Sequence, residues 1–247
     1  MRFSQSWIVA SKDFATFLKK RNIIYSIFVI PLLTSFFLPG VIWYTMHRGQ
    51  GAMSPTELVV LMPAFTFFYL ILAGLIPTTI ASYSIVGEKV EKSLEPLLAT
   101  PTTDGEILFG KGLAAFVLPV TSILGGAAIF MGLTDALTHD MLGYYFFPNY
   151  DAAIVFFLMV PLANIISVEW NVLVSSRVSD VRVAAQIGSL LLIPYGGVYV
   201  AGELNVIPLG NMNTLLTITG IMALVALLLL YVVRATFRRE EILTRWR

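Results

Sequence analysis

The chain has 247 residues, of which 57% are hydrophobic and 13% are charged, with a formal net charge of +1 and a mean hydropathy of +0.81. A soluble domain carries about 25% charged residues, so this chain lacks about half of the charge that would solvate its surface. The composition predicts a polytopic membrane protein. It excludes a conventional soluble enzyme, a disordered protein and a nucleic-acid-binding protein, which would need a basic surface.

Residues 1–21 show the spacing of an amphipathic helix. Apolar side chains recur every three or four residues, while charged side chains occupy the other side. Such a segment is expected to lie in the membrane interface without crossing it. The apolar stripe consists of Phe3, Trp7, Ala10, Phe14 and Phe17, and the polar side carries Lys12, Asp13 and Lys19.

Six apolar stretches are long enough to cross a bilayer core about 30 Å thick, which takes about 20 helical residues. The sequence therefore predicts an all-α membrane protein with six transmembrane helices. Seven prolines inside these stretches predict kinks, with a broken-helix site at Pro77 or Pro194 as the alternative. The spans cover roughly 23–44, 58–80, 107–133, 152–174, 183–201 and 214–233.

Four helix starts carry capping signals. Ser54 with Glu57, and Thr103 with Glu106, have the spacing of a capping box ahead of the second and third spans. Asp151 and Asn213 are the predicted caps of the fourth and sixth spans.

The basic residues predict the orientation of the chain. Lysine and arginine are retained in the short cytoplasmic loops of membrane proteins. Fifteen of the sixteen lie at the termini or in the second and fourth connections, and Arg48 alone lies in an alternate loop. Both termini, including the tail 234–247, are therefore expected to be cytoplasmic.

The connection between the second and third spans, residues 84–104, is rich in charge. On a helix, Val90, Leu94 and Leu97 or Leu98 would share one face, and Glu88 and Lys92 would form a favourable pair four residues apart. Apolar side chains inside a charged rim are typical of a docking element for a soluble partner. A solvated loop is the alternative interpretation.

The run from Glu88 to Lys111 resembles the cytoplasmic hallmark of the permease subunits of type 2 ABC exporters, the ABC-2 family. The resemblance rests on Ser-Leu-Glu-Pro-Leu-Leu-Ala-Thr-Pro, residues 93–101, followed by Gly-Glu-Ile-Leu-Phe-Gly-Lys, residues 105–111. Six spans, an interfacial first helix and cytoplasmic termini are also similar to that family. The outer loop Glu203 to Met212 departs from it, because it is too short for a substantial external domain.

The resemblance implies one permease domain over residues 1–247, in the plasma membrane, that forms the substrate pathway of an ATP-driven exporter. It implies two copies of a separate ABC ATP-binding subunit, which would hold the ATP and magnesium, and a second permease in a homo- or heterodimer. This chain would bind no cofactor or nucleic acid and would otherwise contact only membrane lipid. The implied docking residues are Glu88, Glu91, Lys92, Leu94, Glu95, Leu97 and Leu98.

Residues Gly105–Gly112 match most of a phosphate-binding loop, Gly-x-x-x-x-Gly-Lys. We reject this interpretation because Gly112 has no hydroxyl for magnesium, no strand precedes the motif, and the segment continues into a membrane helix. ATP hydrolysis is accordingly expected in the partner subunit and not in this chain.

Three polar side chains lie inside the fourth span: Asn164, Glu169 and Asn171. A buried acid in a membrane helix is a candidate for proton or cation handling. The proximity of Glu169 to the cytoplasmic end favours instead a structural pairing between helices. The alternative functions are an intramembrane enzyme and a stand-alone ion-coupled carrier that uses Glu169.

Overall fold

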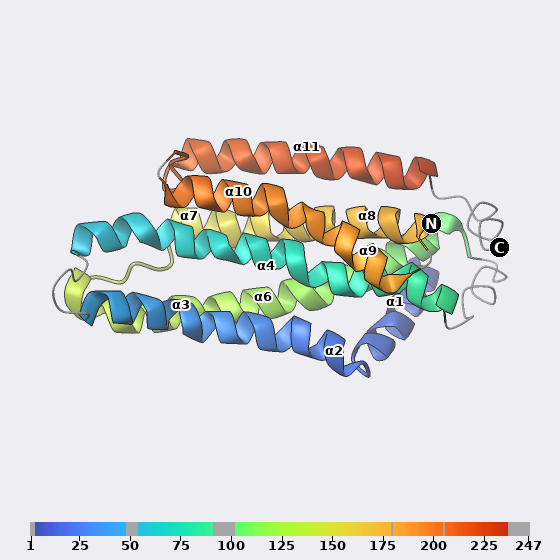
Figure 1. Ribbon diagram of the computed structural model, residues 1–247, viewed down its shortest axis with the longest axis horizontal. Helices are drawn as coiled ribbons and strands as arrows, with labels where there is room; N and C mark the ends of the chain where they lie inside the picture. The colour runs from blue at the N-terminus through green and yellow to red at the C-terminus, as the bar shows by residue number, and fades with distance from the viewer. Residues whose placement is uncertain (1–2, 48–53, 91–101, 179, 205, 237–247) are drawn as a thin grey trace.

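The structure, a computed structural model, describes residues 3–47, 54–90, 102–178, 180–204 and 206–236, without the side chains of residues 83–85 and 87–90. Within these ranges the chain forms helices and connecting turns and no strand. Six helical runs are long and apolar enough to cross a membrane, and they lie along one axis in alternating directions (Figure 1). The prediction of an all-α polytopic membrane protein with six transmembrane helices is confirmed.

The helix bounds are as follows, and each predicted span lies inside one run. Helix α1 (Phe3–Phe17) precedes the first run, which comprises α2 (Arg21–Ile24), a π-helical turn (Tyr25–Val29) and α3 (Ile30–His47). The second and third runs are α4 (Pro55–Val90) and α6 (Asp104–Leu142). The fourth run comprises α7 (Tyr150–Ile154), a π-helical turn (Val155–Met159) and α8 (Val160–Arg177). The fifth comprises α9 (Val181–Gly188), a 3-10 turn (Ser189–Leu191) and α10 (Leu192–Glu203), and the sixth is α11 (Met212–Thr236).

Helices α4 and α8 form the centre of the bundle. In their spans 56% and 61% of the most apolar window is buried, against 17% for each of the spans α9–α10 and α11. In the core, the Tyr69 ring of α4 lies 5.4 Å from both Phe130 of α6 and Phe156 of the fourth run, centroid to centroid. The last two spans therefore leave most of their apolar surface on the outside of the bundle.

Two of the four predicted helix caps are found as predicted. Both capping boxes are formed, since the Ser54 hydroxyl accepts from the Glu57 amide and the Thr103 hydroxyl accepts from the Glu106 amide, at 3.3 Å each. The two single caps were predicted two residues too late. Asn149 and Asn211 cap these helices, accepting from the amides of Ala152 at 2.8 Å and Asn213 at 2.9 Å. An asparagine oxygen reaches the amide two or three residues further on, so the first polar residue of the turn is the one that caps.

At Pro31 a neighbouring helix compensates for the missing proline N–H. Pro31 lacks the N–H that would bond the Ile27 carbonyl four residues earlier, and a π-helical turn precedes it. The Ser122 hydroxyl of α6 donates to that carbonyl instead. Helix α4 continues unbroken through Pro77, whereas Pro194 follows a short 3-10 turn.

The predicted polar side of α1 is wrong at Asp13, which is only 5% exposed. The buried face of α1 is formed by Ser6, Val9, Ala10, Asp13 and Phe17. Phe3 and Trp7, from the predicted apolar stripe, are more than half exposed. The reason is that α1 packs against α6, which offers Lys111 as a partner for the carboxylate, so a charged residue lies on the packed side.

Candidate functional site

The predicted docking residues fall outside the described side chains. Glu88 lies in the last turn of α4, and Glu91, Lys92, Leu94, Glu95, Leu97 and Leu98 lie between residues 91 and 101. The structure does place the two ends of this connection, because α4 continues to Val90 and α6 begins at Asp104. Both lie at the end of the bundle where α1 lies and α11 finishes, which we call the α1 end (Figure 1).

The start of α6 is fixed immediately after this connection. The Thr103 amide donates to the Glu106 carboxylate at 2.9 Å, and the Thr103 hydroxyl accepts from the Glu106 amide. Glu106 is only 3% exposed, and Asp104 adds a second acid in the first turn. Negative charge at a helix amino terminus is favourable because the backbone N–H groups there carry partial positive charge.

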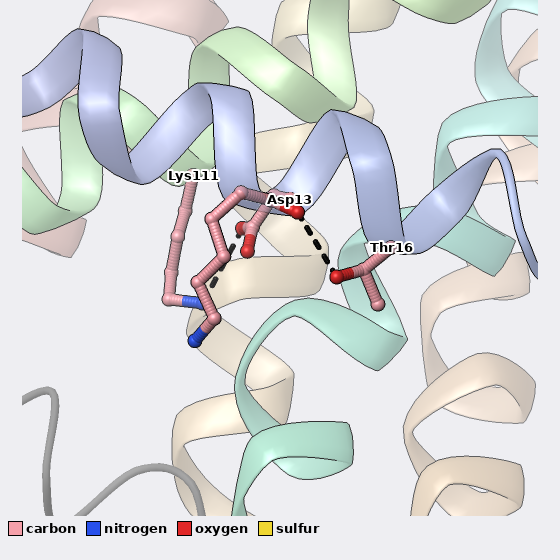
Figure 2. A network of polar contacts seen from close by, with 4 residues as sticks. Asp13, Thr16 and Lys111 are labelled. Carbon is pink, nitrogen blue, oxygen red and sulfur yellow. Dashed lines mark hydrogen bonds and ion pairs between the residues drawn. The ribbon is translucent and has the colours of Figure 1, made fainter.

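A buried ion pair joins α1 to α6 two turns further along. The Lys111 ammonium lies 3.4 Å from the Asp13 carboxylate, and the two residues are 1% and 5% exposed. Figure 2 shows Lys111 reaching from α6 towards Asp13, with Thr16 one turn further along α1. Lys111 is the lysine of the Gly-Lys pair in the predicted hallmark. It is an interior side chain of this interface.

The same two helices approach closely at Gly110. A Cβ atom at this position would lie 2.5 Å from the Ser6 carbonyl oxygen and 2.9 Å from the Val9 Cβ. Only a glycine fits at this distance from α1. Gly110 thus allows the close approach of the two helices, and Lys111 supplies the positive charge of the ion pair. Helix α1 and the first turns of α6 are thereby joined into one packed unit beside the connection.

A polar stripe runs along α8 on the side that faces α4. Its members recur at intervals of three or four residues, and each is completely buried: Asn164, Ser167, Asn171 and Ser175. The α4–α8 contact is the most extensive helix contact in the described part of the chain. Two of the three predicted interior polar residues therefore lie at the centre of the bundle.

Asn171 is the best-bonded member of the stripe. Its amide nitrogen donates to the Ser167 carbonyl at 2.7 Å and to the Thr78 hydroxyl at 3.3 Å, and its oxygen accepts from Ser82 at 3.2 Å. The oxygen is also packed against Gly188 of α9, where a Cβ atom would overlap it. Asn171 thus ties three helices together.

Asn164 differs from Asn171 although both are completely buried. Neither its amide nitrogen nor its oxygen has a hydrogen-bond partner among the described residues. An unpartnered amide in a protein interior costs about 1–3 kcal/mol. The structure therefore separates two asparagines that the sequence presents as equivalent.

Glu169 does not lie on the stripe. It lines a groove of about 390 Å³ between α6, α8 and α11, and Arg234 of α11 lines the same groove. The Glu169 Oε2 is buried without a hydrogen-bond partner among the described residues, while the charge of Arg234 on the neighbouring helix α11 acts on this carboxylate. Both roles of Glu169, a structural pairing between helices and proton or cation handling, stay predictions.

A second polar contact in the core was not predicted. The Ser35 hydroxyl of α3 lies 2.7 Å from the Gly126 carbonyl of α6 and 3.0 Å from the Tyr69 hydroxyl of α4. A Cβ atom at Gly126 would lie 2.8 Å from the Ser35 Oγ. Gly126 thus permits a close contact between α3 and α6 inside this chain. In the sequence, Ser35 is only a serine within an apolar stretch, which does not indicate this contact.

The fold and this buried polar architecture define an α-helical integral membrane protein. A model of the family described as ABC-2 family transporter protein matches residues 17–179, more than half of the 247 residues. The chain belongs to this family, and it is a membrane permease of an ABC-type transporter. The match covers the first four spans and the whole connection between α4 and α6. No curated protein matches the chain.

Proposed function

We propose that this permease forms the substrate pathway of an ATP-driven exporter and docks a separate ATP-binding subunit through residues 84–104. The observation that carries the proposal is the family match over this connection, together with the position of the helix ends that flank it, Val90 and Asp104, at the α1 end. Helix α4 has 36 residues, more than the about 20 that cross a bilayer core, and it continues to Val90 at the α1 end.

The packing at the α1 end supports a route for coupling. A force on the docking segment acts directly on the first turn of α6, because Thr103 and Glu106 fix that turn. The buried Asp13–Lys111 pair and the close contact at Gly110 join α1 to the same turns. Helices α1 and α6 would therefore move together when the partner subunit changes shape.

The proposed assembly contains two permeases and two ATP-binding subunits in the plasma membrane, with both termini cytoplasmic. The distribution of lysine and arginine supports this orientation. Gly196 and Gly197 have no atom within 4 Å of a Cβ position, so they leave a small, open surface for a second permease. Cross-linking in native membranes that yields only monomers with transport intact would exclude the dimer.

The docking assignment is tested by Leu94→Asp. An aspartate in a desolvated groove has no partner, so we expect loss of the ATP-binding subunit on co-purification and loss of substrate-stimulated ATP hydrolysis. Replacement of Glu88 and Lys92 by alanine is the matched control, because an exposed pair contributes about 0–1 kcal/mol. Full association and stimulation with Leu94→Asp would show that the segment is only a connecting loop.

The family assignment favours this function over the two alternatives, an intramembrane enzyme and an ion-coupled carrier that uses Glu169. Members of the family are generally transport subunits without enzymatic activity. ATP hydrolysis and magnesium binding are accordingly assigned to the partner subunit.

A further inference from the structure

The groove between α6, α8 and α11 has the form of a site for a hydrocarbon chain. Its volume of about 390 Å³ lies in the range of ligand sites in proteins, about 300–1,000 Å³. The walls are apolar, with Phe109 and Phe116 on α6, Val172 on α8 and Val233 on α11. Phe109 is 43% exposed, so the groove opens to the outside of the bundle.

Two opposite charges lie in this apolar groove. Glu169 comes from α8 and Arg234 from α11. The charge of Arg234 acts on the Glu169 carboxylate, but the two side chains make no ion-pair contact in the described part of the chain. Glu169 Oε2 is buried and has no donor there, whereas Arg234 is exposed at the mouth. A carboxylate oxygen in apolar surroundings needs a hydrogen-bond donor, preferably a charged one. A ligand that satisfies both residues carries a cationic N–H donor and an anion.

We propose that the groove binds one aminophospholipid from the membrane leaflet at the α1 end. Its primary ammonium donates to Glu169, its phosphate contacts Arg234, and an acyl chain lies along the phenylalanine and valine walls. Arginine suits phosphate because its guanidinium presents several N–H donors in a plane. A choline head group has the same charges but no N–H, and a glycerol head group lacks the cation. This site lies on the three membrane helices α6, α8 and α11 and does not depend on the docking of an ATP-binding subunit.

The proposal is tested by native mass spectrometry of the purified full-length chain in detergent. The protein is titrated separately with phosphatidylethanolamine, phosphatidylcholine and phosphatidylglycerol of identical acyl chains. We expect one ethanolamine lipid to bind at least about tenfold more tightly than either other lipid, as a charged hydrogen bond of about 1.4 kcal/mol requires. Glu169→Gln should abolish the preference over choline, while Arg234→Gln should weaken all three lipids.

A pair of glycines on α6 provides a control that leaves both charges unchanged. Gly112 lines the groove and Gly125 does not, and a Cβ atom at either position meets nothing within 4 Å. Gly112→Leu should fill the groove and remove the ethanolamine preference, whereas Gly125→Leu should bind lipid as the parent chain does.

Three results would overturn the proposal. The first is equal binding of ethanolamine and choline lipids by the parent chain. The second is an unchanged preference in Glu169→Gln, and the third is the same affinity in Gly112→Leu and Gly125→Leu. A groove occupied by a second permease would give the third result, so that result would exclude the lipid as its occupant.

Discussion

Replacing each buried asparagine of α8 by leucine should change stability in opposite directions. Asn171→Leu removes two hydrogen bonds to α4, to Thr78 and Ser82, worth about 0.6 kcal/mol each in membrane helices. The buried Ser82 hydroxyl loses its acceptor as well, at a cost of about 1–3 kcal/mol. We therefore expect Asn171→Leu to destabilise the chain by about 2–4 kcal/mol.

Asn164→Leu removes an amide that has no partner among the described residues, so no hydrogen bond to them is lost. Removal of an unpaired buried amide is worth about 1–3 kcal/mol, and we expect the variant to be more stable than the parent chain. The two variants make the same chemical change on the same helix at equal burial. Their difference therefore cancels the effect of side-chain shape to first order.

Thermal unfolding in one detergent measures this difference. A change of 1 kcal/mol shifts the midpoint by about 2–4 °C for chains of 150–250 residues, so the midpoints should differ by at least about 6 °C. The reasoning is refuted if Asn171→Leu unfolds at the same temperature as Asn164→Leu or at a higher one. In that case the hydrogen bonds of Asn171 would contribute nothing measurable beyond packing.

Three further predictions concern the packed contacts. Asp13→Leu or Lys111→Met alone should cost about 3–5 kcal/mol, because each leaves a buried charge. The double variant should recover most of this loss in thermal unfolding. A double variant no more stable than the worse single variant would show that the ion pair does not stabilise the chain. Gly188→Val should displace the Asn171 amide and lower the midpoint by several degrees. Gly220→Val, with open space at its Cβ, should change the stability by no more than about 0.5 kcal/mol. Thr103→Ala should cost about 1 kcal/mol through loss of the α6 cap, and an unchanged midpoint would show that the cap is dispensable.

The six-helix architecture could be predicted from the sequence because a membrane imposes simple requirements on the length and composition of a helix. A helix must be about 20 apolar residues long to cross the core, and the six runs could therefore be counted directly. Capping boxes are local, and both were found at the predicted residues. The family resemblance rested on residues 88–111 and is confirmed by the match over residues 17–179.

The contacts between helices could not be predicted from the sequence in the same way. Periodicity shows which residues share a face, but it does not show which helix covers that face. Asp13 was predicted to lie on the polar side of α1. Its partner Lys111 is 98 residues away, and no local pattern in the sequence indicates their contact. Asn164 and Asn171 looked alike for the same reason. The groove that Glu169 lines is formed by residues of α6, α8 and α11 that lie far apart in the sequence, so it could not be predicted from local patterns.

The length of α6 has a mechanical consequence. Its 39 residues give a helix about 58 Å long, nearly twice the thickness of the bilayer core. At the end opposite α1, Asp135 accepts hydrogen bonds from the amides of Phe146 and Phe147, at 2.9 Å and 3.0 Å, so the loop after the helix is attached to it. A tilt of about 5° about the α1 end would carry this loop sideways by about 5 Å over the length of the helix. A small rotation of α6 at one membrane face would therefore displace the loop at the opposite face by at least the size of an atom.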